Sequence, residues 1–416
     1  MGVEIRGRTS AKRHTDSDIF DYTPEESLEE LKALATSAGA RVIGVISQSR
    51  IAPDAATLIG SGKLEEVCAQ VKSMGANLVV FDNDLTPTQQ RNLERALDVK
   101  VVDRTQLILD IFASRARTRE GQLQVELAQL QYLLPRLSGH GVEMSRLGGG
   151  IGTRGPGETK LESDRRRINK RVARLKEDIE NVKGSRKVQR RLRQAVPLTM
   201  VALVGYTNAG KSTLFNRLTG AEVLADAKMF ATLDPTVRAI TLPSNRRALL
   251  SDTVGFIRNL PTTLVNAFRA TLEEVVEASV LLHVVDASSP HAAHQTAHVK
   301  MVLEEIGADA TRQILVWNKM DRIELSEFPA EVVAVSGLNG SGFDSLLAAV
   351  DRALPHDPVS SAHFRLPAGD GASLHLLHQF AKVITKSYEG EYCEVEAEVP
   401  QSIKRRLGKF FVETEA

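Results

Sequence analysis

The chain contains 416 residues with a net charge of +1, and 42% of them are hydrophobic. This length predicts about three domains, and the hydrophobic content is high enough for buried cores, which excludes a wholly disordered protein. The two cysteines, Cys68 and Cys393, fit neither a disulfide framework nor a metal-ligand spacing, and no stretch has the pattern of a signal peptide or a membrane span, so we expect a cytoplasmic protein.

The N-terminal quarter is expected to be α/β. Residues 1–22 are polar and are expected to form a flexible tail. Thr23-Pro24 is typical of a helix N-terminus, with the helix reaching about Ala38. Apolar runs at 41–47, 77–81 and 99–102 then alternate with helical patterns at 63–73 and 86–97. This alternation predicts an α/β subdomain over 23–103 with a parallel sheet.

The next segment, 104–195, is expected to be largely helical. Leucines recur at positions 123, 127, 130, 134 and 137, which indicates either the seam of a helical hairpin or a plain amphipathic helix. The glycine-rich stretch Gly148–Lys160 predicts a loop, and a helical pattern broken near Gly184 follows it to about Gln194. Residues 154–193 hold fifteen Lys and Arg against six Asp and Glu, a surplus of nine. This surplus is compatible with a solvated helix face or with a surface that binds RNA.

A nucleotide-binding domain is predicted over 196–355. The apolar strand Met200–Val204 leads into Gly205-Tyr206-Thr207-Asn208-Ala209-Gly210-Lys211-Ser212, which has the spacing of a phosphate-binding loop, and a helical pattern continues through Thr213. The glycines let backbone N–H groups turn toward phosphate, and the helix N-terminus adds partial positive charge. Lys211 is expected to contact the β- and γ-phosphates, and the Ser212 hydroxyl to bind Mg²⁺.

Two later motifs extend this nucleotide site. Asp252-Thr253-Val254-Gly255 follows an apolar strand, and a carboxylate near Mg²⁺ and a glycine N–H facing the γ-phosphate are expected there. Asn318-Lys319-Met320-Asp321 follows the strand 313–317, and Ser336-Gly337-Leu338 is expected to touch the base through its backbone. The Asp321 carboxylate can accept hydrogen bonds from N1–H and the 2-amino group of guanine. Adenine lacks both donors and would leave the carboxylate unpaired, at a cost of about 1–3 kcal/mol. GTP is therefore the predicted substrate.

A switch loop is predicted between the first two motifs, in Phe230-Ala231-Thr232-Leu233-Asp234-Pro235-Thr236. Such a loop needs a threonine whose hydroxyl completes the Mg²⁺ shell when the γ-phosphate is present. Thr232 and Thr236 are both candidates on this ground.

The chain resembles the HflX family of ribosome-associated GTPases over residues 25–400. The resemblance rests on 205–212, 230–236, 252–257 and 318–321, and on two stretches outside the GTPase motifs, Ile59–Glu66 and Arg154–Glu162. In the family pattern the Mg²⁺ threonine lies in Phe-Ala-Thr-Leu-Asp, which selects Thr232 here. We therefore expect Lys211, Thr232 and Gly255 to be catalytic, and Ser212 and Thr232 to bind the metal.

The resemblance also implies an architecture and partners. A P-loop GTPase domain, with a mostly parallel sheet and helices on both faces, would follow an N-terminal α/β domain with a helical hairpin. A small α/β domain over 356–416 would close the chain, and a helix at 372–386 and a strand at 392–399 are predicted in it. The implied function is binding to the large ribosomal subunit and its RNA, with rescue or splitting of stalled ribosomes. We expect a monomer.

Two residues near the phosphates bear on the rate of hydrolysis. Phe256 stands where many small GTPases place a water-orienting glutamine, so we expect slow intrinsic turnover, with the missing stabilisation supplied by a partner or a cation. Asn208 is a candidate for holding K⁺, the alternative being a local turn hydrogen bond.

Two other function classes stay open. One is an ATP-dependent RNA-remodelling protein that acts through its N-terminal domain, with the GTPase domain regulatory. Gly60-Ser61-Gly62-Lys63 lacks the spacing of a phosphate loop, however, and a helix-opening turn is expected there. The other is a GTP-dependent scaffold without ribosome contact. The histidines at 140, 356, 375 and 378 show no metal-ligand spacing with acidic partners.

Overall fold

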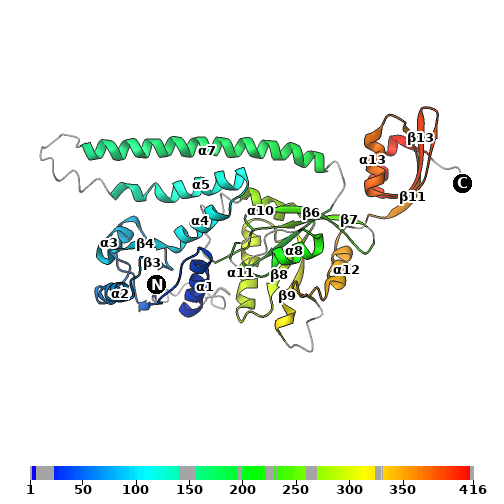
Figure 1. The fold of residues 1–416 in the computed structure, drawn as a ribbon. Coiled ribbons are helices and arrows are strands. Elements are labelled where there is room, and N and C mark those ends of the chain that lie inside the picture. The colour runs from blue at the N-terminus through cyan, green and yellow to red at the C-terminus, as the bar shows by residue number, and fades with distance from the viewer. Residues whose placement is uncertain are drawn as a thin grey trace.

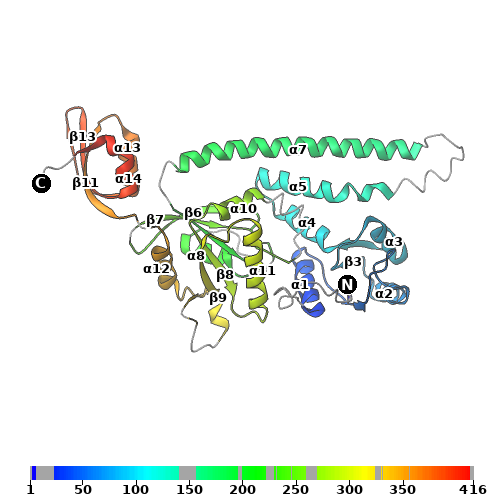
Figure 2. The ribbon, with the colours of Figure 1, turned by 180° about the vertical axis from the view of Figure 1, so that it is seen from behind.

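The computed structural model describes residues 2–5, 23–139, 156–194, 199–221, 229–230, 232–244, 246–258, 269–323, 329, 331–355 and 357–412. Residues 6–22, positions 148–155 of the predicted glycine-rich loop and parts of the predicted switch segments, including Ala231, lie outside the described residues. In Figures 1 and 2 the N-terminal elements, a central sheet and a C-terminal sheet lie in this order along the molecule. The long helix α7 extends along the first two of these parts.

Helix α1 (Pro24–Ser37) begins where the sequence predicts. Thr23 and Glu26 form a capping box, in which the Glu26 N–H donates to Thr23 Oγ1 (3.3 Å) and the Thr23 N–H to Glu26 Oε2 (2.8 Å). Strand β1 (Gly2–Ile5) pairs in parallel with β2 (Ser47–Arg50), so the start of the predicted tail is a strand.

The strand predicted at 41–47 is wrong for most of its length. Residues 41–46 have no regular structure, and β2 begins only at Ser47. Val42 and Ile46 pack against two different cores, while Ile43 and Val45 are 41% and 53% exposed. Strand propensity reflects packing on a paired, pleated surface, and this apolar run has no neighbouring strand to complete such a surface.

A second small sheet follows the predicted order of strands and helices. Strands β3 (Leu78–Phe81) and β4 (Lys100–Asp103) are parallel, and they alternate with helices α2 (Ser61–Met74) and α3 (Pro87–Leu97). Gly60 is the N-cap of α2, and Lys63 Nζ lies 2.9 Å from Glu66 Oε2. The expected helix-opening turn is therefore confirmed, and the lysine is already ion-paired.

The middle of the chain forms a helical hairpin. Helix α4 (Arg104–Arg115) is followed by α5 (Arg119–Leu133), the 3₁₀ turn η2 (Arg136–Gly139) and α7 (Pro156–Gln194). Helices α5 and α7 lie side by side and run in opposite directions (Figure 1). Leu123 and Leu127 of α5 are buried against Leu175 and Ile179 of α7, with Leu130 packed against them, so the first three leucines of the repeat form the hairpin seam. Leu134 and Leu137 lie beyond the end of α5.

Two predictions about α7 are wrong. The glycine-rich loop does not reach Lys160, because the helix starts at Pro156; proline has a fixed φ suited to the first helical position. The helix also continues through Gly184 without a break. One glycine in a helix costs only about 1 kcal/mol relative to alanine, which is too little to end a long helix.

The central sheet has the strand order β10-β9-β8-β5-β7-β6. Neighbouring strands are parallel except for the antiparallel pair β6–β7. The strands are β5 (Thr199–Gly205), β6 (Thr236–Thr241), β7 (Arg247–Asp252), β8 (Val280–Asp286), β9 (Arg312–Asn318) and β10 (Val332–Ala334). The helices are α8 (Lys211–Thr219), α10 (Arg269–Val276), α11 (Ala292–Glu305) and α12 (Phe343–Ala353). The predicted mostly parallel α/β fold is confirmed.

Side chains of β5 alternate between two cores, as expected for a strand covered on both faces. Val201 and Leu203 pack with α8 and α12. Ala202 and Val204 belong to a larger core that contains residues of α10 and α11, and also of α1, α4 and α5. The N-terminal helices therefore share one core with the nucleotide-binding sheet and pack directly against it.

The C-terminal region is a separate antiparallel sheet with the order β12-β13-β11-β14. Its elements are β11 (Val359–Pro367), α13 (Gly371–Phe380), β12 (Lys382–Glu389), β13 (Tyr392–Pro400), α14 (Gln401–Arg406), the 3₁₀ turn η4 (Gly408–Phe410) and β14 (Phe411–Val412). The predicted strand near 392–399 is confirmed. The helix predicted to reach 386 ends at Phe380 instead, because the residues after it pair with β13.

Candidate functional site

The loop between β5 and α8 has backbone angles that require glycine at both ends. Gly205 has φ +151° and Gly210 has φ +94°. A Cβ atom at Gly205 would collide with the carbonyl oxygen of Val284, and one at Gly210 with Asn318 Nδ2. Both positions combine a positive φ with a close approach, which only glycine accepts without strain.

The Lys211 amino group is buried inside this loop. Its Nζ donates to the carbonyl oxygens of Gly205 (3.0 Å) and Tyr206 (2.8 Å). Burial lowers the pKa of Lys211 to about 8, and the nearby Asp252 carboxylate opposes that shift. The amine is thus held where an anionic ligand would stabilise its charged form.

Three oxygen-bearing side chains meet beside Lys211. Ser212 Oγ lies 2.7 Å from Asp252 Oδ2 and 2.7 Å from Thr232 Oγ1, and Thr232 Oγ1 lies 2.9 Å from Asp252 Oδ2. Burial raises the pKa of Asp252, and hydrogen bonds from Ser212 and Thr232 and the Lys211 charge oppose this. Within the described part of the chain, the buried Asp252 Oδ1 has no hydrogen-bond partner.

This cluster fits a magnesium ion. Mg²⁺ prefers oxygen ligands and commonly uses few protein groups together with phosphate oxygens and water. Thr232 belongs to the cluster, whereas Thr236 is the first residue of β6 and forms its ladder with Asp252. The geometry thus separates the two threonine candidates and favours Thr232.

The opposite end of the site is built around Asn318. Its Nδ2 donates to the carbonyl oxygen of Ala209 (2.8 Å), and its Oδ1 accepts from the Gly337 N–H (2.9 Å). Asp321 Oδ1 accepts from Ser336 Oγ at 2.5 Å, and Lys319 Nζ lies 2.7 Å from Asp286 Oδ2. Asn318 therefore joins the phosphate loop to the 336–338 loop, and Ser336 orients the Asp321 carboxylate.

These parts surround one open cavity of about 320 Å³. The predicted residues that line it are Thr207, Asn208, Gly210, Lys211, Ser212, Thr213, Phe230, Thr232, Thr253, Gly255, Asn318, Lys319, Asp321, Gly337 and Leu338. The cavity is also lined by Arg322, which the sequence reasoning missed. Arg322 shares the 3₁₀ turn η3 (Met320–Arg322) with Asp321, so its adjacency to that motif could have identified it.

Other predicted nucleotide-binding residues do not line this cavity: Gly205, Tyr206, Ala209, Leu233, Asp234, Asp252, Val254, Met320 and Ser336. Leu233 and Val254 are buried in the larger core, where alternation along an extended chain directs every second side chain. Asp252 and Ser336 do not line the cavity themselves, but each is hydrogen-bonded to a side chain that does, Asp252 to Ser212 and Ser336 to Asp321. Ala231 lies outside the described residues.

Tyr206 and Asp234 instead contact the N-terminal region. Tyr206 Oη donates to a Glu30 carboxylate oxygen of α1 and accepts from the Arg258 N–H at 3.1 Å. Asp234 Oδ2 accepts from the N–H groups of Arg117 and Thr118, both at 2.8 Å, just before α5. The phosphate loop is therefore bonded to α1, and the switch loop is bonded to the segment that leads into the helical hairpin.

Phe256 points away from the cavity. Its side chain is buried in the larger core, and its backbone is bonded to the phosphate loop through Thr207 N–H to Phe256 O (2.8 Å) and Phe256 N–H to Gly205 O (3.1 Å). Phe256 is not among the residues that line the cavity.

Comparisons with known proteins agree with this site. Three family models match: a GTP-binding GTPase N-terminal region over residues 25–113, a GTP-binding GTPase middle region over 115–193, and a 50S ribosome-binding GTPase over 200–319. Among the described residues, no helix combines the length and apolar character needed to cross a membrane.

Curated relatives extend the likeness to nearly the whole chain. The GTPase HflX of Caldanaerobacter subterraneus subsp. tengcongensis is 49% identical over 93% of this chain and 91% of its own. That of Alkalihalophilus pseudofirmus is 48% identical over 79% of each chain, and that of Escherichia coli (strain K12) is 44% identical over 92% of each. Because relatives this similar cover more than nine tenths of the chain, and a GTPase model matches the domain that forms the cavity, the chain belongs to the HflX family and is a GTPase.

Proposed function

We propose that this GTPase is a switch that binds the large ribosomal subunit and its RNA, and that it rescues or splits stalled ribosomes. The observation that carries the proposal is that two residues of the switch loop make contacts in two different parts of the protein. Thr232 belongs to the oxygen cluster beside Lys211. Two residues later, the Asp234 carboxylate accepts hydrogen bonds from backbone N–H groups just before α5. A change at the γ-phosphate would thus be transmitted to the hairpin of α5 and α7.

Within the cavity we propose the following roles. Lys211 moves its amino group from the two loop carbonyls to the β- and γ-phosphates, and the Gly255 N–H donates to the γ-phosphate. Ser212 and Thr232 would hold Mg²⁺, which when bound neutralises charge that develops on the phosphate oxygens. Asp321 would accept from the guanine base. No cavity side chain in the described residues replaces the water-orienting glutamine, so we infer slow hydrolysis without a partner.

Asn208 is proposed to help hold K⁺, which would supply part of the missing charge. It lines the cavity, is exposed and has a φ of +61°, in the left-handed region that asparagine tolerates better than most residues. Measurement of GTP turnover in KCl and in NaCl tests this role. A rate that is the same in both salts, for the wild type and for Asn208→Ala, would remove it.

The ribosomal RNA surface is proposed to be the exposed side of α7. Arg165, Arg167 and Lys170 are all exposed, and phosphate contacts by such residues make affinity fall steeply with salt. Arg165→Ser/Arg167→Ser should weaken pelleting with ribosomes and reduce the salt slope by about 1 for each lost phosphate contact. The matched control, Arg405→Ser/Arg406→Ser, removes the same charge from exposed positions of α14. Equal effects of the two pairs would contradict the assignment to α7.

Cosedimentation through sucrose gradients tests the whole proposal. The wild type should migrate with large subunits in a non-hydrolysable GTP analogue and much less in GDP, because only the triphosphate has the γ-phosphate to which the switch loop is proposed to respond. Thr232→Ala should lose this difference. Equal binding in both nucleotides would refute the switch, and no binding in either would refute the partner.

The proposal also covers the oligomeric state, the localisation and the domain organisation of the protein. We propose that the protein acts as a monomer in the cytoplasm, since its proposed partner is the ribosome. The proposed domain organisation is a tail (1–22), an α/β subdomain (23–103), a helical hairpin segment (104–195), the GTPase domain (196–355) and a small C-terminal domain (356–416).

A further inference from the structure

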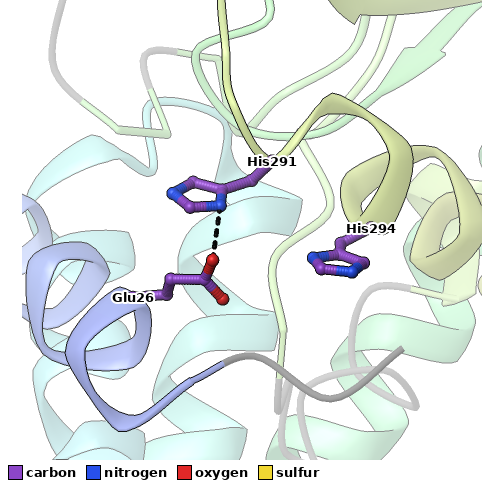
Figure 3. Close-up of side chains that lie close together, drawn as sticks. All are labelled: Glu26, His291 and His294. Atoms are coloured by element: carbon purple, nitrogen blue, oxygen red, sulfur yellow. Dashed lines mark ion pairs between the residues drawn. The ribbon is translucent and has the colours of Figure 1, made fainter. Parts of the chain in front are cut away.

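A cluster of one carboxylate and two imidazoles lies away from the nucleotide cavity. It comprises Glu26, His291 and His294 (Figure 3). One carboxylate oxygen and one nitrogen from each ring all lie within 4.8 Å of one another. Glu26 comes from the first turn of α1, whereas both histidines come from the start of α11. The cluster thus joins the N-terminal region to the nucleotide-binding sheet.

The Glu26 carboxylate is held in a fixed orientation. Its Oε2 accepts from the Thr23 N–H at 2.8 Å, within the capping box that opens α1. Its Oε1 lies 2.9 Å from His291 Nδ1. Hydrogen bonds of this kind to the outer oxygen of a carboxylate are typical of metal ligands, because they orient the group and limit its motion.

The two histidines are also well placed. His291 is the N-cap of α11 and His294 is three residues later, so both lie on the same side of the first turn. Figure 3 shows the two rings on adjoining sides of the Glu26 carboxylate. The side chains of His291 and Glu26 are 30% and 22% exposed, which leaves a route for an ion from solvent.

We propose that Glu26, His291 and His294 bind a divalent transition-metal ion, with Zn²⁺ as the test ion. Imidazole nitrogen suits zinc and its neighbours in the transition series, whereas Mg²⁺ demands oxygen ligands, so this site is chemically distinct from the nucleotide site. Zinc holds His nitrogen and carboxylate oxygen at about 2.0–2.2 Å, which places tetrahedral ligand atoms about 3.4 Å apart. To reach that spacing, the Glu26–His291 pair at 2.9 Å would open slightly, and any wider pair, all within 4.8 Å, would close by side-chain rotation. Water would take the fourth position.

A bound ion would tie the two regions of the protein together. Helix α11 follows β8, and Asp286 at the end of β8 is bonded to Lys319 of the base-reading motif. The ion would therefore restrain α1 against a segment that continues directly into the nucleotide site. Its binding free energy adds to the stability of the docked arrangement, since an undocked α1 presents only one of the three ligands.

Titration calorimetry of EDTA-treated full-length protein with Zn²⁺, without nucleotide or Mg²⁺, tests the proposal. We expect one tight ion per chain and a zinc-dependent rise in melting temperature. His291→Ala, His294→Ala and Glu26→Gln should each weaken zinc by at least about tenfold and abolish the rise. Glu26→Gln is the most informative, because glutamine preserves the capping box but is a poor metal ligand.

His375→Ala/His378→Ala is the matched control. These histidines have the same spacing on α13, and among the described residues they have no acidic third ligand. This control should bind zinc like the wild type. GDP affinity, measured on every variant, reports that the fold is retained. The proposal fails if the wild type takes up no tight zinc, if Glu26→Gln binds zinc as the wild type does, or if the control loses the ion instead.

Discussion

Replacement of Asp321 by asparagine should change which base the protein binds. In the proposed complex the carboxylate accepts two hydrogen bonds from guanine, and Ser336 Oγ holds one of its oxygens at 2.5 Å. Asparagine keeps the size of the side chain but has only one acceptor oxygen and presents an N–H₂ group. That group faces the guanine 2-amino donor unfavourably, but it suits the 2-oxo group of xanthine.

The expected loss of GDP affinity follows from the charge and the exposure of Asp321. Hydrogen bonds to a charged group contribute about 1.5–3 kcal/mol each. Because Asp321 is exposed, the lower value applies. The bond to the 2-amino group is lost and the remaining bond is no longer to a charged group, which together amount to up to about 3 kcal/mol, or up to about 150-fold in Kd. Ser336→Ala removes only the bond that orients the carboxylate, so a loss of about 1 kcal/mol, roughly fivefold, is expected.

Titration calorimetry with GDP, xanthosine diphosphate and ADP measures these differences. The wild type should prefer GDP, Asp321→Asn should prefer the xanthine nucleotide, and Ser336→Ala should keep the wild-type order with weaker binding. The reasoning is refuted if Asp321→Asn binds GDP within about threefold of the wild type, or if the wild type binds ADP as tightly as GDP.

Three further changes test other parts of the site. In Gly255→Ala the new Cβ would lie 2.9 Å from Thr207 Cα and 3.0 Å from Lys211 Nζ. The rate of single-turnover GTP hydrolysis should therefore fall by about 100-fold, while GDP still binds. An unchanged rate would show that this glycine is not needed for hydrolysis. Burial lowers the pKa of Lys211 to about 8 from 10.5, so the unfolded chain binds more protons between these values. The nucleotide-free wild type should therefore gain up to about 3 kcal/mol of stability as pH rises from 8 to 10.5, relative to Lys211→Met; parallel urea-denaturation profiles of the two proteins would contradict this. Asp234→Asn weakens the hydrogen bonds to the N–H groups before α5, including that of Thr118. The free energy of unfolding should fall by about 1–2 kcal/mol in the same urea-denaturation assay. An unchanged free energy of unfolding would mean that water replaces the carboxylate fully.

Local sequence was sufficient wherever the chemistry is local. The helix start at Thr23 follows from an N-cap threonine followed directly by proline. The phosphate loop follows from glycine spacing, since a positive φ and a close approach at Gly205 and Gly210 leave no other residue. The alternation of strands and helices in the N-terminal region likewise predicted the parallel pairing of β3 with β4.

Only the tertiary structure decided what depends on distant partners. It placed the Thr232 hydroxyl beside Ser212 and Asp252, and it directed the Tyr206 hydroxyl toward α1. It left residues 41–46 without a strand partner. It also brought Glu26 to His291, residues 265 positions apart in the chain. Such contacts depend on how whole elements pack, and short-range spacing contains no information about that packing.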